Sequence, residues 1–76
     1  MTAKSDFEWI PRGMSRLEAA RYVGVGPDKF DEMVADRRMP KPREIDRRIV
    51  WDRVELDIAF SELPHRGKGN FFDQAS

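Results

Sequence analysis

The chain has 76 residues, a formal net charge of zero and no cysteine. This length allows one small domain with little core, and without cysteine neither disulfides nor a thiolate zinc site can supplement that core. No apolar run approaches membrane-spanning length and no signal-peptide core is present, so we expect a cytoplasmic protein.

Three regions are expected along the chain. Residues 1–13 form an N-terminal arm. Four residues in and next to it are too apolar for a plain tail and suit an extended segment closing over the core: Phe7, Trp9, Ile10 and Met14. The alternative is an exposed arm that binds a partner. Residues 14–64 form the folded domain. Residues 65–76 are polar and bear glycine, which predicts disorder, although Phe71-Phe72 interrupts this tail.

A first short helix is predicted after Ser15. Ser15 is a good N-cap, and Glu18, three residues later, completes a capping box. Leu17 and Ala20 start an apolar stripe at helical spacing. Gly24 can end this helix in the left-handed conformation that glycine adopts most easily.

A second helix is predicted directly after the turn and ends near Arg38. Gly26 suits its N-cap and Pro27 its first position. Its apolar face consists of Phe30, Met33 and Val34. Arg37 falls near that buried face, and cations at this end of a helix also favour the helix dipole.

The spacing of three residues carries the functional signal. A small residue at Ala20, a glycine at Gly24 and a large apolar residue at Phe30 form the pattern of a DNA-binding helix-turn-helix. The small residue lets the helices cross closely, the glycine makes the turn and the large residue fixes the angle. The alternative is an ordinary helical hairpin in a small core.

A β-hairpin is predicted next. Pro40 and Pro42 stop the helix and favour extended backbone. Residues 43–45 and 49–51 are rich enough in β-branched or aromatic side chains for two short strands. The tip at 46–48 lacks glycine, which makes a poorer turn than Asn-Gly.

A third helix is predicted between Asp52 and Pro64. Asp52 is its N-cap and Glu55 follows three residues later. Its apolar residues are Val54, Leu56, Ile58, Ala59, Phe60 and Leu63. Trp51, just before the helix, is expected in the core under the hairpin and against the first helix. The predicted fold is therefore mainly α with a small β-hairpin, a winged helix-turn-helix in the order helix-turn-helix-wing-helix.

Positive charge gathers in one stretch of this neutral chain. Residues 37–48 contain six basic and two acidic residues, a local balance of +4. The basic residues are Arg37, Arg38, Lys41, Arg43, Arg47 and Arg48. A basic stripe of this kind is a weak but appropriate electrostatic footprint for nucleic acid.

Residues 14–63 resemble the small MerR-like winged-helix proteins of the AlpA and phage excisionase type. The resemblance lies in five short words, which read Ser15-Arg16-Leu17-Glu18-Ala19-Ala20, Val23-Gly24-Val25, Phe30-Asp31, Arg38-Met39-Pro40-Lys41-Pro42 and Val50-Trp51-Asp52-Arg53, followed by Glu55-Leu56-Asp57. The resemblance implies a DNA-binding accessory factor that bends attachment-site DNA and steers an integrase towards excision, or that regulates genes of a mobile element.

The sequence departs from that family's pattern in two places. The wing tip commonly carries glycine, and here it is Asp46-Arg47-Arg48. The second helix is acidic on the face that would meet DNA: its outward residues are Asp28, Asp31, Glu32, Ala35 and Asp36. A carboxylate can accept a hydrogen bond from cytosine, but it repels phosphates.

Ten residues are candidates for DNA contact. They are Ser15, Arg16, Asp28, Lys29, Glu32, Arg38, Lys41, Arg43, Arg47 and Arg48. Arg47 and Arg48 are the strongest, because the wing tip can reach phosphates or a narrow minor groove; the alternative for both is a solvated turn. Ser15 and Arg16 lie at a helix N-terminus, which suits a phosphate, although capping alone explains Ser15.

Other chemistry finds little support. His65 is the only histidine, is expected to face solvent and has no second ligand at metal spacing. No serine, histidine and carboxylate set suggests nucleophilic catalysis, and no glycine loop suggests phosphate binding. We expect neither an enzyme nor a bound cofactor or metal.

The sequence thus predicts an excisionase-like recombination directionality factor that acts as an architectural protein. Its expected partners are double-stranded DNA, a site-specific integrase and further copies of itself on DNA. Two alternatives stay open: a transcriptional regulator of a mobile element, and a protein-interaction module that does not bind DNA.

Overall fold

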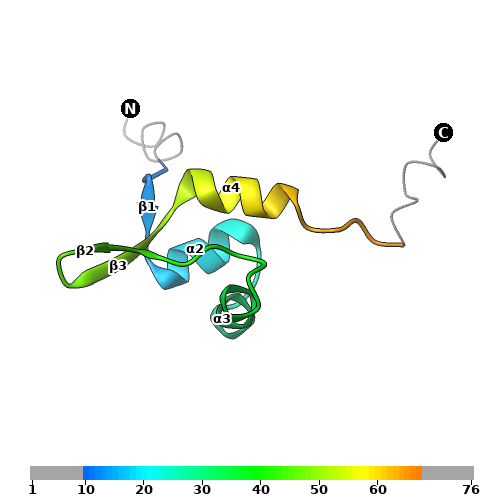
Figure 1. Cartoon of the computed structure of the whole chain (residues 1–76), viewed down its shortest axis with the longest axis horizontal. Helices are drawn as coiled ribbons and strands as arrows, with labels where there is room; N and C mark the ends of the chain where they lie inside the picture. The colour runs from blue at the N-terminus through cyan, green and yellow to red at the C-terminus, as the bar shows by residue number, and fades with distance from the viewer. Residues whose placement is uncertain (1–9, 68–76) are drawn as a thin grey trace, which may run out of the picture.

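The computed structural model describes residues 10–67 and contains three helices and a three-stranded antiparallel sheet in that range. The elements are, in chain order, β1 (Gly13–Met14), α2 (Arg16–Val23), α3 (Pro27–Ala35), β2 (Arg43–Ile45), β3 (Arg48–Asp52) and α4 (Arg53–Ser61). The helices gather on one side, and the β2–β3 hairpin projects away from them (Figure 1). This arrangement is compatible with a small winged-helix-like fold. No helix within residues 10–67 is long and apolar enough to cross a membrane.

The predicted start of α2 and the turn to α3 are confirmed. Ser15 Oγ accepts a hydrogen bond from the Glu18 N–H, and Glu18 in turn accepts from the Ser15 N–H at 2.8 Å. Gly24 has φ of 89°, the left-handed conformation that the turn requires. Gly26 is the N-cap of α3 and Pro27 its first residue. The helix pair therefore has the geometry that its capping residues dictate.

The end of α3 differs from the prediction for Arg37. This residue is exposed and takes a left-handed φ of 72°, the role that glycine usually plays after a helix. In this conformation the Arg38 N–H donates a hydrogen bond to the Met33 carbonyl at 2.8 Å. This carbonyl is in the last turn of α3 and would otherwise lack a donor. The backbone reversal turns the Arg37 side chain away from the buried face on which a helical wheel places it.

A single apolar cluster holds the domain together. Its buried members come from α2, α3, α4, the strands β1 and β3 and the connection after α3: Met14, Ala19, Ala20, Phe30, Met33, Met39, Trp51 and Leu56. The core position of Trp51 is confirmed: it lies in one buried cluster with Ala19 and Ala20 of α2 and also meets an aromatic ring of α3. The rings of Trp51 and Phe30 meet edge to face with centroids 5.1 Å apart.

Two apolar predictions are wrong in detail. Leu17 is 60% exposed, and Ala19 with Ala20 supplies the buried side of α2, because small residues let α3 approach closely. On α4, Leu56 is buried and Ala59 and Leu63 pack against the core, whereas three further apolar residues are exposed. These are Val54, Ile58 and Phe60. The helix also ends at Ser61, before Pro64.

The sheet contains a strand that the sequence does not indicate. Gly13 and Met14 pair with Asp52 and Trp51, so β1 lies beside β3 on the side opposite to β2. Two residues are too few for a readable alternation of polar and apolar side chains. Of the apolar residues expected to close over the core, Met14 is buried in this strand and Ile10 is exposed. Phe7, Trp9 and the Phe71-Phe72 pair lie outside the described residues.

Candidate functional site

The exposed face of α3 is acidic, as predicted. Asp28, Asp31, Glu32 and Asp36 are all exposed, whereas Phe30 and Met33 on the opposite face are buried. A helix that presents four carboxylates to solvent repels phosphates unless neighbouring cations compensate for them. The positions of the nearby arginines and lysine therefore decide what this face can bind.

Three candidate cations compensate for these carboxylates within the protein. Arg16 forms a two-pronged contact with Asp31, its Nε and Nη2 each donating at 2.8 Å, and its Nη2 lies 3.8 Å from Asp28. This pairing raises the pKa of Arg16 and lowers the pKa of Asp31. Lys29 Nζ lies 3.1 Å from Glu32. The Arg16 contacts tie the start of α2 to α3, whereas the Lys29 contact lies within α3.

Arg38 is paired in the same way. Its guanidinium contacts the Asp36 carboxylate at 2.8 Å, and its backbone N–H also donates to Asp36 at 3.1 Å. The hydrogen bond from Arg38 holds the pKa of Asp36 below its usual value. Phosphate binding by Arg38 would have to compete with this carboxylate.

In the described part of the chain, three exposed cations at the hairpin tip and just before its first strand are not paired. The β2–β3 register places Glu44 opposite Ile49 and Ile45 opposite Arg48, and a two-residue turn at Asp46-Arg47 joins the strands. Asp46 adopts φ of 56°, which replaces the glycine that a tight turn usually needs. Within residues 10–67, Lys41, Arg47 and Arg48 are exposed and no carboxylate lies within 4.0 Å of their charged groups.

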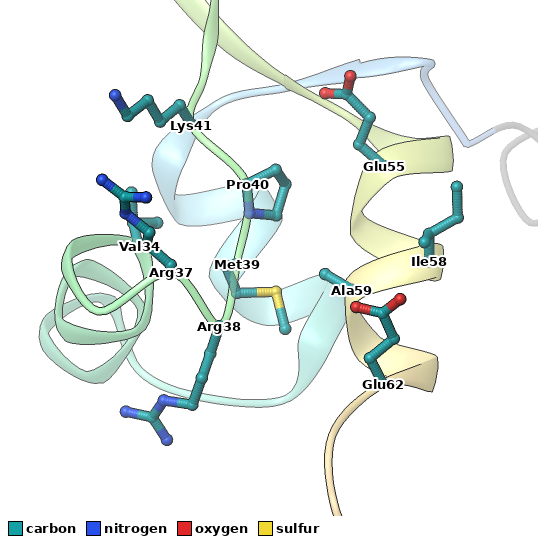
Figure 2. A pocket seen from close by; sticks show the side chains of 10 residues that line it. All are labelled: Val34, Arg37, Arg38, Met39, Pro40, Lys41, Glu55, Ile58, Ala59 and Glu62. Carbon is teal, nitrogen blue, oxygen red and sulfur yellow. The ribbon is translucent and has the colours of Figure 1, made fainter.

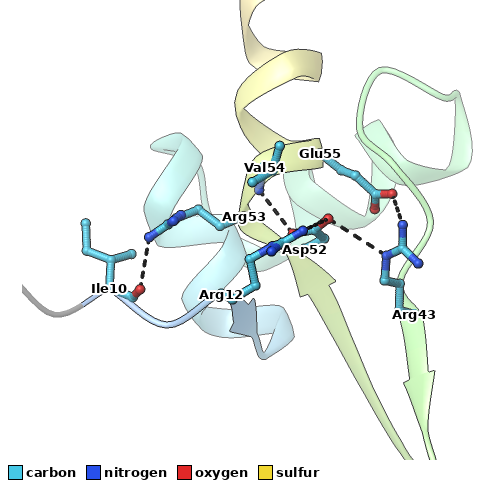
Figure 3. A network of polar contacts seen from close by, with 7 residues as sticks. All are labelled: Ile10, Arg12, Arg43, Asp52, Arg53, Val54 and Glu55. Atoms are coloured by element: carbon cyan, nitrogen blue, oxygen red, sulfur yellow. Dashed lines mark hydrogen bonds and ion pairs between the residues drawn. The ribbon is translucent and has the colours of Figure 1, made fainter.

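The base of the hairpin is fixed by one buried carboxylate. Asp52 is only 6% exposed and accepts hydrogen bonds from two groups of Arg12 and from the Val54 N–H (Figure 3). Arg43 Nε lies 3.9 Å from the same carboxylate. Asp52 is thus the N-cap of α4, as predicted, and it also joins β1 and β2 to that helix. These contacts set the direction in which the hairpin projects.

Two neighbouring contacts extend this network. Arg43 donates a hydrogen bond to the Glu55 carboxylate of α4. Glu55 therefore does not complete a capping box with Asp52, contrary to the prediction, because the long Arg43 side chain competes successfully for its carboxylate. Arg53 donates through Nη1 to the Ile10 carbonyl and through its backbone N–H to the Arg12 carbonyl. The main role of Arg43 in this structure is therefore to join β2 to α4. The role of Arg12 could not be predicted from the sequence, because its partner Asp52 lies forty positions away.

We expect acid to loosen this junction. The hydrogen bonds from Arg12 lower the pKa of Asp52, so the folded state binds fewer protons at this group than the unfolded chain does. Its contribution to stability is present above the unfolded pKa near 3.9 and is lost as the pH falls through the lower folded value. Melting temperatures of Asp52→Asn and the unaltered chain should therefore differ clearly at neutral pH and converge at strongly acidic pH. A constant difference would show that the Asp52 charge does not hold the junction.

A groove of about 410 Å³ lies between α4 and the connection that leads from α3 to the hairpin. Arg37, Arg38 and Lys41 line the side near α3, and Glu55, Ile58 and Glu62 line the α4 side (Figure 2). Cations and carboxylates thus stand on opposed walls of an open, mixed-charge groove. This groove lies beside the base of the hairpin.

The remaining candidates have mainly structural surroundings. Ser15 uses its hydroxyl to cap α2. His65 is exposed after α4. Within residues 10–67 no three histidine, aspartate or glutamate side chains come together as a metal ion would require.

Comparisons with known proteins add no assignment. No family model matches the chain, and neither a curated protein nor a solved structure shows significant similarity to it.

Proposed function

We propose that this protein is a winged helix-turn-helix DNA-binding protein of the MerR-like type, and that it acts as an excisionase-like architectural factor. The observation that supports this best is the pairing pattern of its cations. Carboxylates hold three cations of the helix pair, namely Arg16, Lys29 and Arg38. Within residues 10–67, by contrast, no carboxylate pairs with Lys41, Arg47 or Arg48, which lie on and beside a hairpin that projects from the body. Unpaired cations on a projecting element are available to phosphates at no cost in lost ion pairs.

In this proposal the hairpin contributes most of the affinity for DNA, and α3 positions the protein on the duplex. The hairpin lies along the phosphate backbone or enters the minor groove, while the N-terminal part of α3 faces the major groove. Asp28 and Glu32 accept hydrogen bonds from cytosine amino groups there. A single copy has few free cations, so tight binding requires neighbouring copies or an integrase. Several bound copies then bend the duplex and help the excisive complex to assemble.

Fluorescence anisotropy with labelled duplexes tests the proposal directly. Attachment-site DNA of the element should be bound more tightly than random DNA, and both affinities should fall steeply with salt. With the element's integrase and paired attachment sites, the protein should raise excision and leave integration unchanged. Unchanged excision together with altered transcription from a nearby promoter would favour a transcriptional regulator.

The acidic face of α3 supports a second candidate, a protein-interaction module. Four exposed carboxylates, all of them in ion pairs with the chain's own cations, suit a basic protein surface as well as they suit DNA bases. Absence of binding to any duplex at low salt would support this reading over the first.

The ion pair between Arg16 and Asp31 supplies a prediction for DNA affinity. Asp31→Asn removes the carboxylate that Arg16 contacts at 2.8 Å and leaves only Asp28, 3.8 Å away. Arg16 is then held less tightly and can turn to a phosphate, and one repelling carboxylate disappears from α3. We expect binding to all duplexes to tighten, and the salt dependence to steepen by about one unit of slope. Asp57→Asn is the control, because it removes the same charge from α4, where Asp57 accepts from Tyr22. Equal effects of both substitutions would show that only net charge matters.

A further inference from the structure

The projecting hairpin carries two isoleucines that no part of the described domain covers. Ile45 is 56% exposed and Ile49 is 51% exposed, although Val50 and Trp51, next along β3, are buried. Phosphate contacts come from cations and polar groups, so they do not account for two exposed branched apolar side chains beside Arg47 and Arg48. The register of β2 and β3 shows which of the two isoleucines lies on each face of the hairpin.

The two isoleucines lie on opposite faces of the hairpin. Residues directly opposite in an antiparallel pair share a face, so Ile45 shares its face with Arg48, and Ile49 shares its face with Glu44. Trp51 and Met14 point into the core, which places Ile49 on the core side of the sheet and Ile45 on its outer side. On the outer side, Ile45 and Val50 line a hollow whose rim includes Arg12 and Arg43.

The surroundings of Ile45 suit DNA. Ile45 immediately precedes the turn, and its cross-strand neighbour Arg48 is an unpaired cation. The turn beside it contains one exposed carboxylate, Asp46, which the two arginines Arg47 and Arg48 outnumber. Ile49 lies one position further from the turn and directly opposite Glu44, whose charge repels phosphates.

We infer that Ile45 is an apolar wedge that enters the minor groove and partly unstacks one base step, while Arg47 and Arg48 hold the flanking phosphates. This inference rests on the proposed DNA binding and assigns the bending of DNA to one residue. Two strands lie about 4.8 Å apart from axis to axis, and the minor groove is about 6 Å wide, so the hairpin tip with its side chains enters only where the groove opens. Unstacking of one base step opens the groove in this way. The two-residue turn at Asp46-Arg47 keeps the tip as small as two paired strands allow. Apolar side chains inserted between base steps are a general means of kinking DNA.

The test uses the full chain and a short A·T-rich duplex with a donor and an acceptor dye at its ends and 2-aminopurine at a central TA step. Binding should bring the dyes closer and raise the 2-aminopurine fluorescence, because that base becomes unstacked. Ile45→Ala should abolish most of both signals and weaken binding about tenfold, while the slope of affinity against salt stays unchanged. Ile45→Leu, which keeps an apolar side chain, should retain the bend. Ile49→Ala is the matched control and should bend DNA like the unaltered chain.

The outcomes separate this inference from the proposed function. Salt-dependent binding by the unaltered chain with no bend, or a bend that survives Ile45→Ala, overturns the wedge and leaves DNA binding intact. Absence of any binding overturns both. Self-association without DNA that Ile45→Ala and Ile49→Ala both weaken also overturns the wedge, because the isoleucines would then contact a second copy. Circular dichroism of each variant checks that the hairpin substitutions leave the fold unchanged.

Discussion

Trp51→Ala should unfold much of the protein at ordinary temperature. Trp51 is 4% exposed, packs edge to face on Phe30 and donates from Nε1 to the Pro40 carbonyl at 2.8 Å. It therefore joins β3 to α3 and to the connection that leads into the hairpin. Removing a large buried aromatic side chain costs roughly 3–5 kcal/mol, and small domains have only about 5–15 kcal/mol of stability in total.

Thermal and urea unfolding followed by circular dichroism measure this effect. Trp51→Phe is an informative companion, because it keeps an aromatic ring against Phe30 but leaves the Pro40 carbonyl without its donor; its cost should be smaller than that of alanine. Tyr22→Phe is the control for the loss of a polar aromatic group at an exposed site, and it should change stability by less than about 1 kcal/mol. A cooperative transition for Trp51→Ala within a few degrees of the unaltered chain would contradict the central role of this side chain.

The sequence predicts the local structure of this domain well because local chemistry determines it. Ser15 with Glu18, Gly24 and Pro27 each fix a helix boundary through their own backbone preferences, and those boundaries are confirmed. The hairpin is also found close to its predicted position, because prolines precede it and Asp52 caps the helix that follows.

Tertiary competition explains what the sequence does not predict. The helical stripe that begins at Leu17 fails, because the close approach of α3 selects the smaller Ala19. The distant Arg43 captures Glu55 from its capping role, and Arg12 reaches Asp52 across forty positions of sequence. The candidate site shows the same limit. Counting charges predicts a basic stripe, but only the structure distinguishes Arg16 and Arg38, which are paired, from Arg47 and Arg48, which are not.

Because Arg47 and Arg48 are unpaired within residues 10–67, we expect their removal to have a large effect on DNA binding. Replacing both Arg47 and Arg48 with alanine should weaken binding to every duplex by roughly tenfold and reduce the salt slope by about two units, one for each lost phosphate contact. Stability should change little, because both side chains are exposed and form no ion pair within the described part of the chain. Affinity measured over a range of salt concentrations gives both quantities.

A matched pair of substitutions separates hairpin contact from net charge. Arg21→Ala combined with Arg66→Ala removes the same two charges from exposed positions in the last turn of α2 and beyond α4, away from the projecting hairpin (Figure 1). Charges more than a Debye length from the bound phosphates are screened, so this control should bind DNA almost as the unaltered chain does at physiological salt. If the two double variants lose affinity equally, the protein attracts DNA only through its overall field. If the hairpin variant alone loses slope, Arg47 and Arg48 touch phosphates, and the hairpin acts as a wing on DNA.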